Sequence, residues 1–167
     1  LISNGITYLL VNQATRLLDR IHKILYNYII YKYAPSNSIG IQCPVGRSLL
    51  IICSKLYQKY SNCGLRIKAP NIEEFPGDYH IKPETTSAIL TIRSKFDEFH
   101  STGYYAPAGS CVKVTVLEGN STGWDLRISS HTDDLSDMEC FNRWPIAYSC
   151  VKLKRSLSVT TAFGGLV

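Results

Sequence analysis

The fold is decided by residues 99–116, which read FHSTGYYAPAGSCVKVTV. In the last part of this stretch valine alternates with lysine and threonine, and a period of two is typical of a β-strand with one buried face. Gly103, Pro107 and Gly109 precede the alternation. Glycine suits turn geometry and proline stiffens a turn, so the stretch predicts a strand reached through tight turns.

Similar alternation recurs in the second half of the chain. The predicted strands lie at 88–92, 112–116, 124–128, 148–154, 157–160 and from 165 onward. Residues 118–123 hold two glycines and an asparagine, which predicts a hairpin between the second and third of these strands. Short strands at this spacing indicate a β-sandwich or jelly-roll-like domain.

The first part of the chain has a helical pattern instead. Apolar residues recur every three or four positions from Ile6 to Tyr28, which predicts a helix that cannot pass Pro35. Asp19 and Lys23 are spaced to pair across one turn of it. A second helix is expected from about residue 47 to residue 60. Its predicted apolar face consists of Leu49, Cys53, Leu56 and Tyr60.

Prolines separate the two patterns. Pro70, Pro76 and Pro83 fall within fourteen residues, which predicts a linker or an irregular crossing segment. The expected organisation is a helical segment at 1–70, a Pro-rich linker at 71–87 and a β part at 88–167. The predicted fold class is therefore α+β: a helical N-terminal segment followed by an all-β, sandwich or jelly-roll-like partial domain.

The net charge of +5 is unevenly distributed. Residues 1–70 carry nine Lys/Arg and one acid, giving 9 − 1 = +8, and residues 71–167 carry nine Lys/Arg and twelve acids, giving 9 − 12 = −3. A basic face could meet nucleic acid or anionic lipid. Because the basic residues are spread singly, we favour a solvated helix surface and expect no nucleic-acid partner.

The sequence contains no local catalytic motif. No H-E-x-x-H, G-x-S-x-G or P-loop occurs, and the four histidines are isolated. The sequence has no unbroken run of 18 apolar residues, the length that a membrane-spanning helix needs. The six cysteines form no C-x-x-C and no zinc-ligand spacing, so we interpret them as reduced and buried. A disulfide framework would require secretion, and Asn120-Ser121-Thr122 is a glycosylation sequon.

Two weaker ligand sites are considered. The acidic group around His131, which comprises Asp133, Asp134, Asp137 and Glu139, could bind calcium, but it lacks the EF-hand pattern. Aspartates that cap local amides in a turn explain it without a metal. An exposed aromatic ring could bind a sugar. Trp124 falls on an apolar strand face and is expected in the core, whereas Trp144 precedes Pro145 in a loop and is the better candidate for ligand contact.

Four blocks of this sequence resemble, in order and spacing, the opening of the enhancin-like peptidase domain, the "M sixty" peptidase family. They are FHSTGYYAPAG at 99–109 with the strand that follows, LRISSHTDDL at 126–135, RWP at 143–145 and GGL at 164–166. The family's corresponding blocks are S-T-G-L-Y-x-P-x-G, a strand running into a G-C-H-T-D-like turn, R-x-P and G-G-L-hydrophobic. Ser129-Ser130 replaces the family's Gly-Cys, and Tyr104 stands where Leu is common.

The resemblance implies mainly structural roles for the matched residues. We expect the fold to be held by Ser101, Thr102, Gly103, Tyr105, Pro107, Gly109, His131, Asp133, Arg143, Pro145, Gly164 and Gly165. His131 and Asp133 are expected to bond each other or nearby backbone. No catalytic or metal-binding residue can be carried over, because the family's zinc motif would lie beyond Val167.

Within the family, HTDDL at 131–135 and FPG at 75–77 look most like the TRPM channel-associated factors. That likeness implies a non-catalytic, cytoplasmic protein at the plasma membrane that binds a TRPM-type cation channel and regulates its surface delivery and gating. The alternatives are the β subdomain of a secreted zinc metallopeptidase acting on mucin-type glycoproteins, with zinc in the parent protein, and a carbohydrate-binding module. We treat the chain as a fragment, because it begins at Leu1 and its one methionine is Met138.

Overall fold

The computed structural model describes residues 16, 19, 20, 23, 39–59, 66–79, 84–93 and 95–167. The four isolated positions near the start are helical. Asp19 Oδ2 and Lys23 Nζ lie 2.9 Å apart, so the predicted pair across one helical turn is confirmed. The rest of the predicted first helix, including its stop at Pro35, lies outside the described residues.

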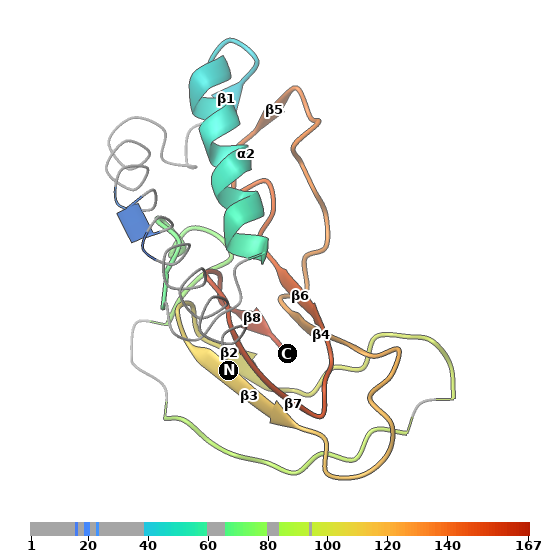
Figure 1. The fold of residues 1–167 in the computed structure, drawn as a ribbon. Coiled ribbons are helices and arrows are strands. Elements are labelled where there is room, and N and C mark those ends of the chain that lie inside the picture. The colour runs from blue at the N-terminus through green and yellow to red at the C-terminus, as the bar shows by residue number, and fades with distance from the viewer. Residues whose placement is uncertain are drawn as a thin grey trace, which may run out of the picture.

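The described part of the chain is mostly β, with one helix described along its length, α2 (Figure 1). The elements are β1 Ile39–Gly40, α2 Pro44–Lys59, β2 Tyr105–Ala106, β3 Cys111–Thr115, β4 Asp125–Ile128, β5 Cys140–Phe141, β6 Ser149–Lys152, β7 Ser156–Thr160 and β8 Gly165–Leu166. The strands form antiparallel pairs, β1 with β5, β2 with β8, β3 with β7 and β4 with β6. The predicted combination of a helix and a β-rich part is confirmed at this level. The described strands form four two-stranded sheets, and the sandwich or jelly-roll arrangement stays a prediction.

Helix α2 begins three residues earlier than predicted. Pro44 is its first residue, a position that suits proline because the first helical N–H has no partner within the helix. The carbonyl of Cys43 accepts the first helical hydrogen bond from the Arg47 N–H at 3.0 Å. The buried face is rotated from the predicted one, since Leu49 and Leu56 are only half-buried. Its buried members are Gly46, Leu50, Cys53, Ser54 and Tyr57.

The predicted hairpin at residues 118–123 is wrong. Strand β3 pairs with β7 and β4 pairs with β6, so the strands on either side of this turn do not pair with each other (Figure 1). Both ladders extend by one bond, from Val116 N to Arg155 O at 2.9 Å and from Leu153 N to Trp124 O at 2.8 Å. The glycines and asparagine at 118–123 do form a turn, but the strands that pair with β3 and β4 come from later in the chain.

The last strand, β8, lies between two other segments. It pairs with β2, and the Val167 N–H extends this pairing by donating to Tyr104 O at 3.0 Å. On its other side, the Ser129 N–H just after β4 donates to Leu166 O at 2.8 Å. Strand β8 therefore connects the β2 segment to the β4–β6 ladder.

The strand predicted at 88–92 is also wrong. Residues 84–93 contain no strand, and Ile89 is 82% exposed. Alternating side chains make a strand only where a neighbouring strand supplies hydrogen bonds, and no described strand pairs with this segment.

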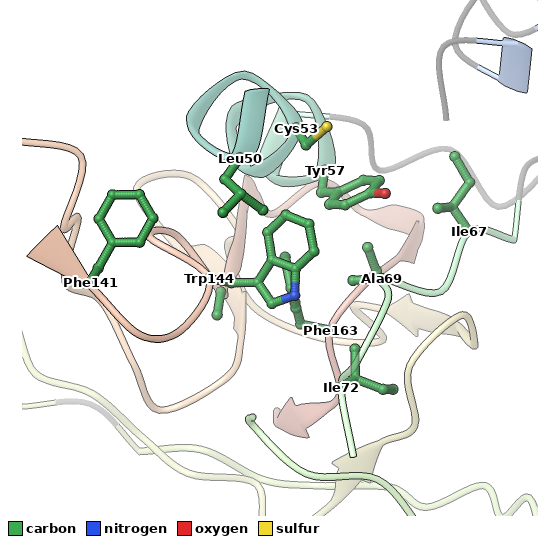
Figure 2. Packing of buried hydrophobic residues seen from close by; sticks show 11 residues of the cluster. Leu50, Cys53, Tyr57, Ile67, Ala69, Ile72, Phe141, Trp144 and Phe163 are labelled. Carbon is green, nitrogen blue, oxygen red and sulfur yellow. The ribbon is translucent and has the colours of Figure 1, made fainter. Parts of the chain in front are cut away.

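The main core surrounds Trp144 and joins distant parts of the chain (Figure 2). Trp144, Tyr57 and Phe163 form three edge-to-face ring pairs with centroids 5.6–5.8 Å apart, a favoured aromatic geometry. The other buried members are Leu50, Cys53, Ile67, Ala69, Ile72, Phe141, Ala147 and Ala162. The division of the chain at residues 70 and 87 stays a prediction, but this one core takes side chains from both sides of residue 70.

Candidate functional site

Three of the predicted motif blocks meet in one cluster. The Arg143 guanidinium donates through Nη2 to Asp133 Oδ2, and His131 Nδ1 lies 4.0 Å from Asp133 Oδ1. Phe75 contacts both basic residues: its ring centroid is 4.8 Å from the His131 ring and 4.7 Å from Arg143 Cζ. We call Phe75, His131, Asp133 and Arg143 the Asp133 cluster. It joins segments more than fifty residues apart in the sequence.

The charge on Asp133 is stabilised in this cluster. Partial burial raises the pKa of the Asp133 carboxyl, but its own backbone N–H and the Arg143 guanidinium lower it more, so the pKa lies below the ordinary 3.8. Arg143 Nη1 is buried without a hydrogen-bond partner, while the Arg143 plane lies over Phe75. The Asp133 side chain remains 43% exposed. The arrangement can hold three loops together, and it contains no hydroxyl or thiol group.

One of the neighbouring acidic residues, Asp134, bonds to the backbone through its side chain. Asp134 Oδ1 accepts a hydrogen bond from the Ser136 N–H at 2.8 Å, as expected for an acidic turn that caps local amides. Among the described residues, no group of three His, Cys, Asp or Glu side chains could hold a metal ion. The calcium alternative therefore receives no support from this turn.

The backbone conformation at Ser129, beside the cluster, explains why the family pattern has glycine at this position. Ser129 has φ +98°, a conformation that favours glycine, and the family has glycine at this position. The Ser129 Oγ accepts a hydrogen bond from the His131 N–H at 3.3 Å. Ser129 therefore has a strained backbone conformation, and its side chain makes one hydrogen bond that glycine could not make.

Gly164 and Gly165 lie where a side chain would collide. A Cβ on Gly165 would be 2.5 Å from Ser129 Cα, and one on Gly164 would be 2.4 Å from the Tyr105 hydroxyl oxygen. Real Cβ atoms essentially never come this close. The two glycines let β8 pass between the Ser129 backbone and the Tyr105 ring.

The block at 101–109 fixes the other side of β8. Thr102 Oγ1 donates to Val167 O at 2.7 Å and accepts from the Tyr104 N–H at 3.2 Å. Ser101 Oγ accepts from the Gly103 N–H at 3.2 Å. Gly103 and Gly109 have φ +76° and +72°, which glycine adopts without strain.

Tyr105 and Pro107 complete that block. The Tyr105 hydroxyl donates to Gly77 O at 3.3 Å, and its ring packs edge-on to Tyr79 with centroids 4.8 Å apart. The Pro107 carbonyl accepts from the Ser110 N–H at 3.0 Å in the turn before β3.

The expectation of an exposed Trp144 is wrong. Trp144 is 0% exposed and its Nε1 donates to Pro70 O at 2.9 Å, while the adjacent Pro145 is also buried. A wholly buried ring offers no surface to a ligand. Trp124, expected in the core, is instead half-buried beside His100, with ring centroids 5.8 Å apart. The sequence places Trp144 in a loop, but it does not show that α2 packs over this loop (Figure 2).

The cysteines differ from the reduced, buried interpretation. Cys111 is disulfide-bonded, whereas Cys43, Cys53, Cys140 and Cys150 are free. Cys140 and Cys150 are exposed. Burial raises the pKa of the Cys53 thiol to about 12. The interpretation therefore holds for Cys53, is wrong on burial for Cys140 and Cys150, and is wrong on redox state for Cys111. Cys63 lies outside the described residues.

Arg47 is an anchoring residue that sequence reasoning missed. Its guanidinium donates to Ser136 O at 2.6 Å and Glu139 O at 3.0 Å, and lies over the Phe141 ring at 5.5 Å. It joins the first turn of α2 to the loop between Asp133 and Arg143. An isolated arginine near a helix start carries no sequence signal for such a role.

These features define a β-rich domain whose motif residues hold loops and strands in place. The model of the N-terminal domain of M60-like peptidases matches residues 81–167, which is just over half of the chain. The chain therefore belongs to this family, and the matched residues contain strands β2 to β8. No curated protein and no solved structure matches the chain. No described helix is long and apolar enough to cross a membrane.

Proposed function

We propose that this chain is the amino-terminal, non-catalytic part of an M60-like zinc peptidase that acts on mucin-type glycoproteins. The observation that carries the proposal is the family match over residues 81–167. Its motif residues make backbone contacts, as those of a supporting domain would. The disulfide at Cys111 supports the secreted location that such a substrate requires, because disulfides persist in oxidising compartments.

The described residues do not fit the zinc that the family implies. They supply no group of three metal-binding side chains, and structural and catalytic zinc sites need at least three protein ligands. In the proposed protein, zinc and the catalytic base belong to a part of the parent protein other than this chain. The role of residues 81–167 is to provide a rigid support beside that part.

Digestion of a mucin-type glycoprotein by the natural full-length protein tests the proposal. We expect cleavage that a zinc chelator abolishes and added zinc restores. The same glycoprotein stripped of its glycans is the control, and it should be cleaved less. Absence of cleavage, or cleavage that survives removal of zinc, would contradict the proposal.

A channel-associated role is the second candidate. It is supported by the HTDDL block at 131–135 and the FPG block at 75–77, which the structure brings together in the Asp133 cluster. In this role the protein is cytoplasmic, lies at the plasma membrane, and binds a TRPM-type cation channel to regulate its delivery and gating.

Co-precipitation from cells expressing a TRPM-type channel tests this second role. The channel should be recovered with the full-length protein, and the surface current should change when the protein is added. A cation channel of another class is the control. Equal recovery of both channels, or of neither, would remove the channel role.

A further inference from the structure

The chain has a single N-x-S/T sequon, Asn120-Ser121-Thr122. The middle residue is not proline, so the sequon meets the pattern of an N-glycosylation acceptor. The pattern alone says nothing of accessibility, which a transferase needs. The structure supplies that information.

Asn120 lies in an exposed turn at one end of the molecule. The turn runs from the end of β3 to the start of β4, at the end of the described part that lies far from α2 (Figure 1). Residues 117–120 and 122–123 are all exposed, and Leu117 is 63% exposed. Gly119 and Gly123 have φ +86° and +87°, and a Cβ on either would meet nothing within 4 Å. A bulky group attached here would displace no packed side chain.

The asparagine side chain has a defined orientation in this turn. Asn120 Oδ1 accepts a hydrogen bond from the Thr122 N–H at 2.9 Å. Because a backbone N–H requires an acceptor, this bond fixes which amide atom is the oxygen. The turn therefore uses the oxygen of the amide, and Nδ2 is the atom that would be joined to a sugar.

A separate observation concerns the compartment. Cys111, at the start of β3, is disulfide-bonded, and stable disulfides form where proteins are secreted. N-linked glycans are added in the same pathway. This part of the inference rests on the proposed function, because that function places the protein outside the cell.

We propose that Asn120 is N-glycosylated. Nδ2 attacks the anomeric carbon of an oligosaccharide carried on a lipid pyrophosphate. The new bond joins Nδ2 to that carbon, and the carbon–oxygen bond to the pyrophosphate breaks. The pyrophosphate leaves with the electron pair, and the amide proton passes to a base of the transferase. No atom is oxidised or reduced.

The glycan has a consequence for assembly. A bulky, solvated group on the turn between β3 and β4 keeps that end of the domain in solvent. The peptidase portion of the protein therefore contacts another face. The opposite end, where α2 lies, is free of the glycan.

Peptide mapping of the natural full-length protein tests the proposal. Trypsin releases peptide 114–127, which contains Asn120 and no other asparagine. We expect this peptide to carry a glycan, and to show aspartate at position 120 after treatment with peptide-N-glycosidase. An unmodified peptide 114–127 would overturn the proposal.

A second arm separates the site from the location. The full 167-residue chain is expressed in eukaryotic cells behind an added secretory leader. It should show one glycosidase-sensitive step in mobility, which Asn120→Gln and Thr122→Ala remove and Thr122→Ser retains. If this chain is secreted without a glycan, Asn120 is not an acceptor, whatever the protein does. If it is glycosylated but the natural protein is not, the secreted location is wrong, and the proposed peptidase role loses that support while its cleavage test still stands.

Discussion

Gly165→Ala tests the position of β8 between two segments. A Cβ at residue 165 would lie 2.5 Å from Ser129 Cα and 2.6 Å from Ser129 N. Carbon atoms make favourable contact at about 3.5–4.0 Å, so the two backbones must separate by about 1 Å. That movement breaks the 2.8 Å hydrogen bond from Ser129 N to Leu166 O.

The cost follows from these two effects. Overpacking of a tight site costs about 1–3 kcal/mol, and loss of the hydrogen bond adds about 1 kcal/mol. We expect Gly165→Ala to lower the free energy of unfolding by about 2–4 kcal/mol. With a urea m-value near 2 kcal/mol/M, the unfolding midpoint falls by about 1–2 M.

Urea unfolding followed by tryptophan fluorescence measures this effect. Gly123→Ala is the control: nothing lies within 4 Å of the new Cβ, so the variant adds no steric overlap. Its φ of +87° adds backbone strain instead, which Gly165 does not share because its φ is not in the left-handed region. Ser129→Gly in the same chain should not rescue Gly165→Ala, because the two closest atoms belong to the backbone. A midpoint equal to that of wild type or of Gly123→Ala would refute the reasoning.

Three further outcomes are expected. At Ser129, where φ is +98°, the Ser129→Gly variant should have a free energy of unfolding about 1 kcal/mol higher than that of Ser129→Ala. At Ser130 the usual preference for Ala over Gly should hold. Urea unfolding midpoints that favour Ala at both positions would contradict the backbone strain at Ser129. Because the pKa of Asp133 is lowered below 3.8, its ionised form stabilises the fold above that pH, and this stability is lost as the pH falls through the folded-state pKa. Asp133→Asn should therefore lower the thermal midpoint at pH 7, with the gap closing below pH 3.8; a gap independent of pH would argue against the ion pair. Iodoacetamide at pH 8 should label the exposed Cys140 and leave Cys53, whose pKa is raised to about 12, unmodified; equal labelling of both would show that Cys53 is accessible.

Local patterns predicted the elements better than their partners. The valines at 112–116 and the run at 157–160 became β3 and β7, because side-chain alternation is a property of each segment alone. Which strands pair depends on the whole chain, so the hairpin at 118–123 was wrong. Residues 88–92 show the same limit of local patterns. Their side chains alternate, but no described strand pairs with them.

The candidate site was predicted in part. Motif residues such as Asp133 and Arg143 were identified, but only the structure shows that they pair and that Phe75 lies against both of their blocks. Trp144 was misplaced because burial by α2 is a long-range effect. Ser129 shows a reverse case: its departure from the family's glycine is visible in the sequence, but the positive φ that explains the glycine is visible only in the structure.

The central claim is that this chain supports a zinc peptidase without holding the metal itself. The most direct test is metal analysis by mass spectrometry of two purified samples, the natural full-length protein and the 167-residue chain. We expect one zinc per molecule in the full-length protein and none in the 167-residue chain. Stoichiometric zinc in the 167 residues, or its absence from the full-length protein, would show that this chain is not the metal-free support of a zinc peptidase.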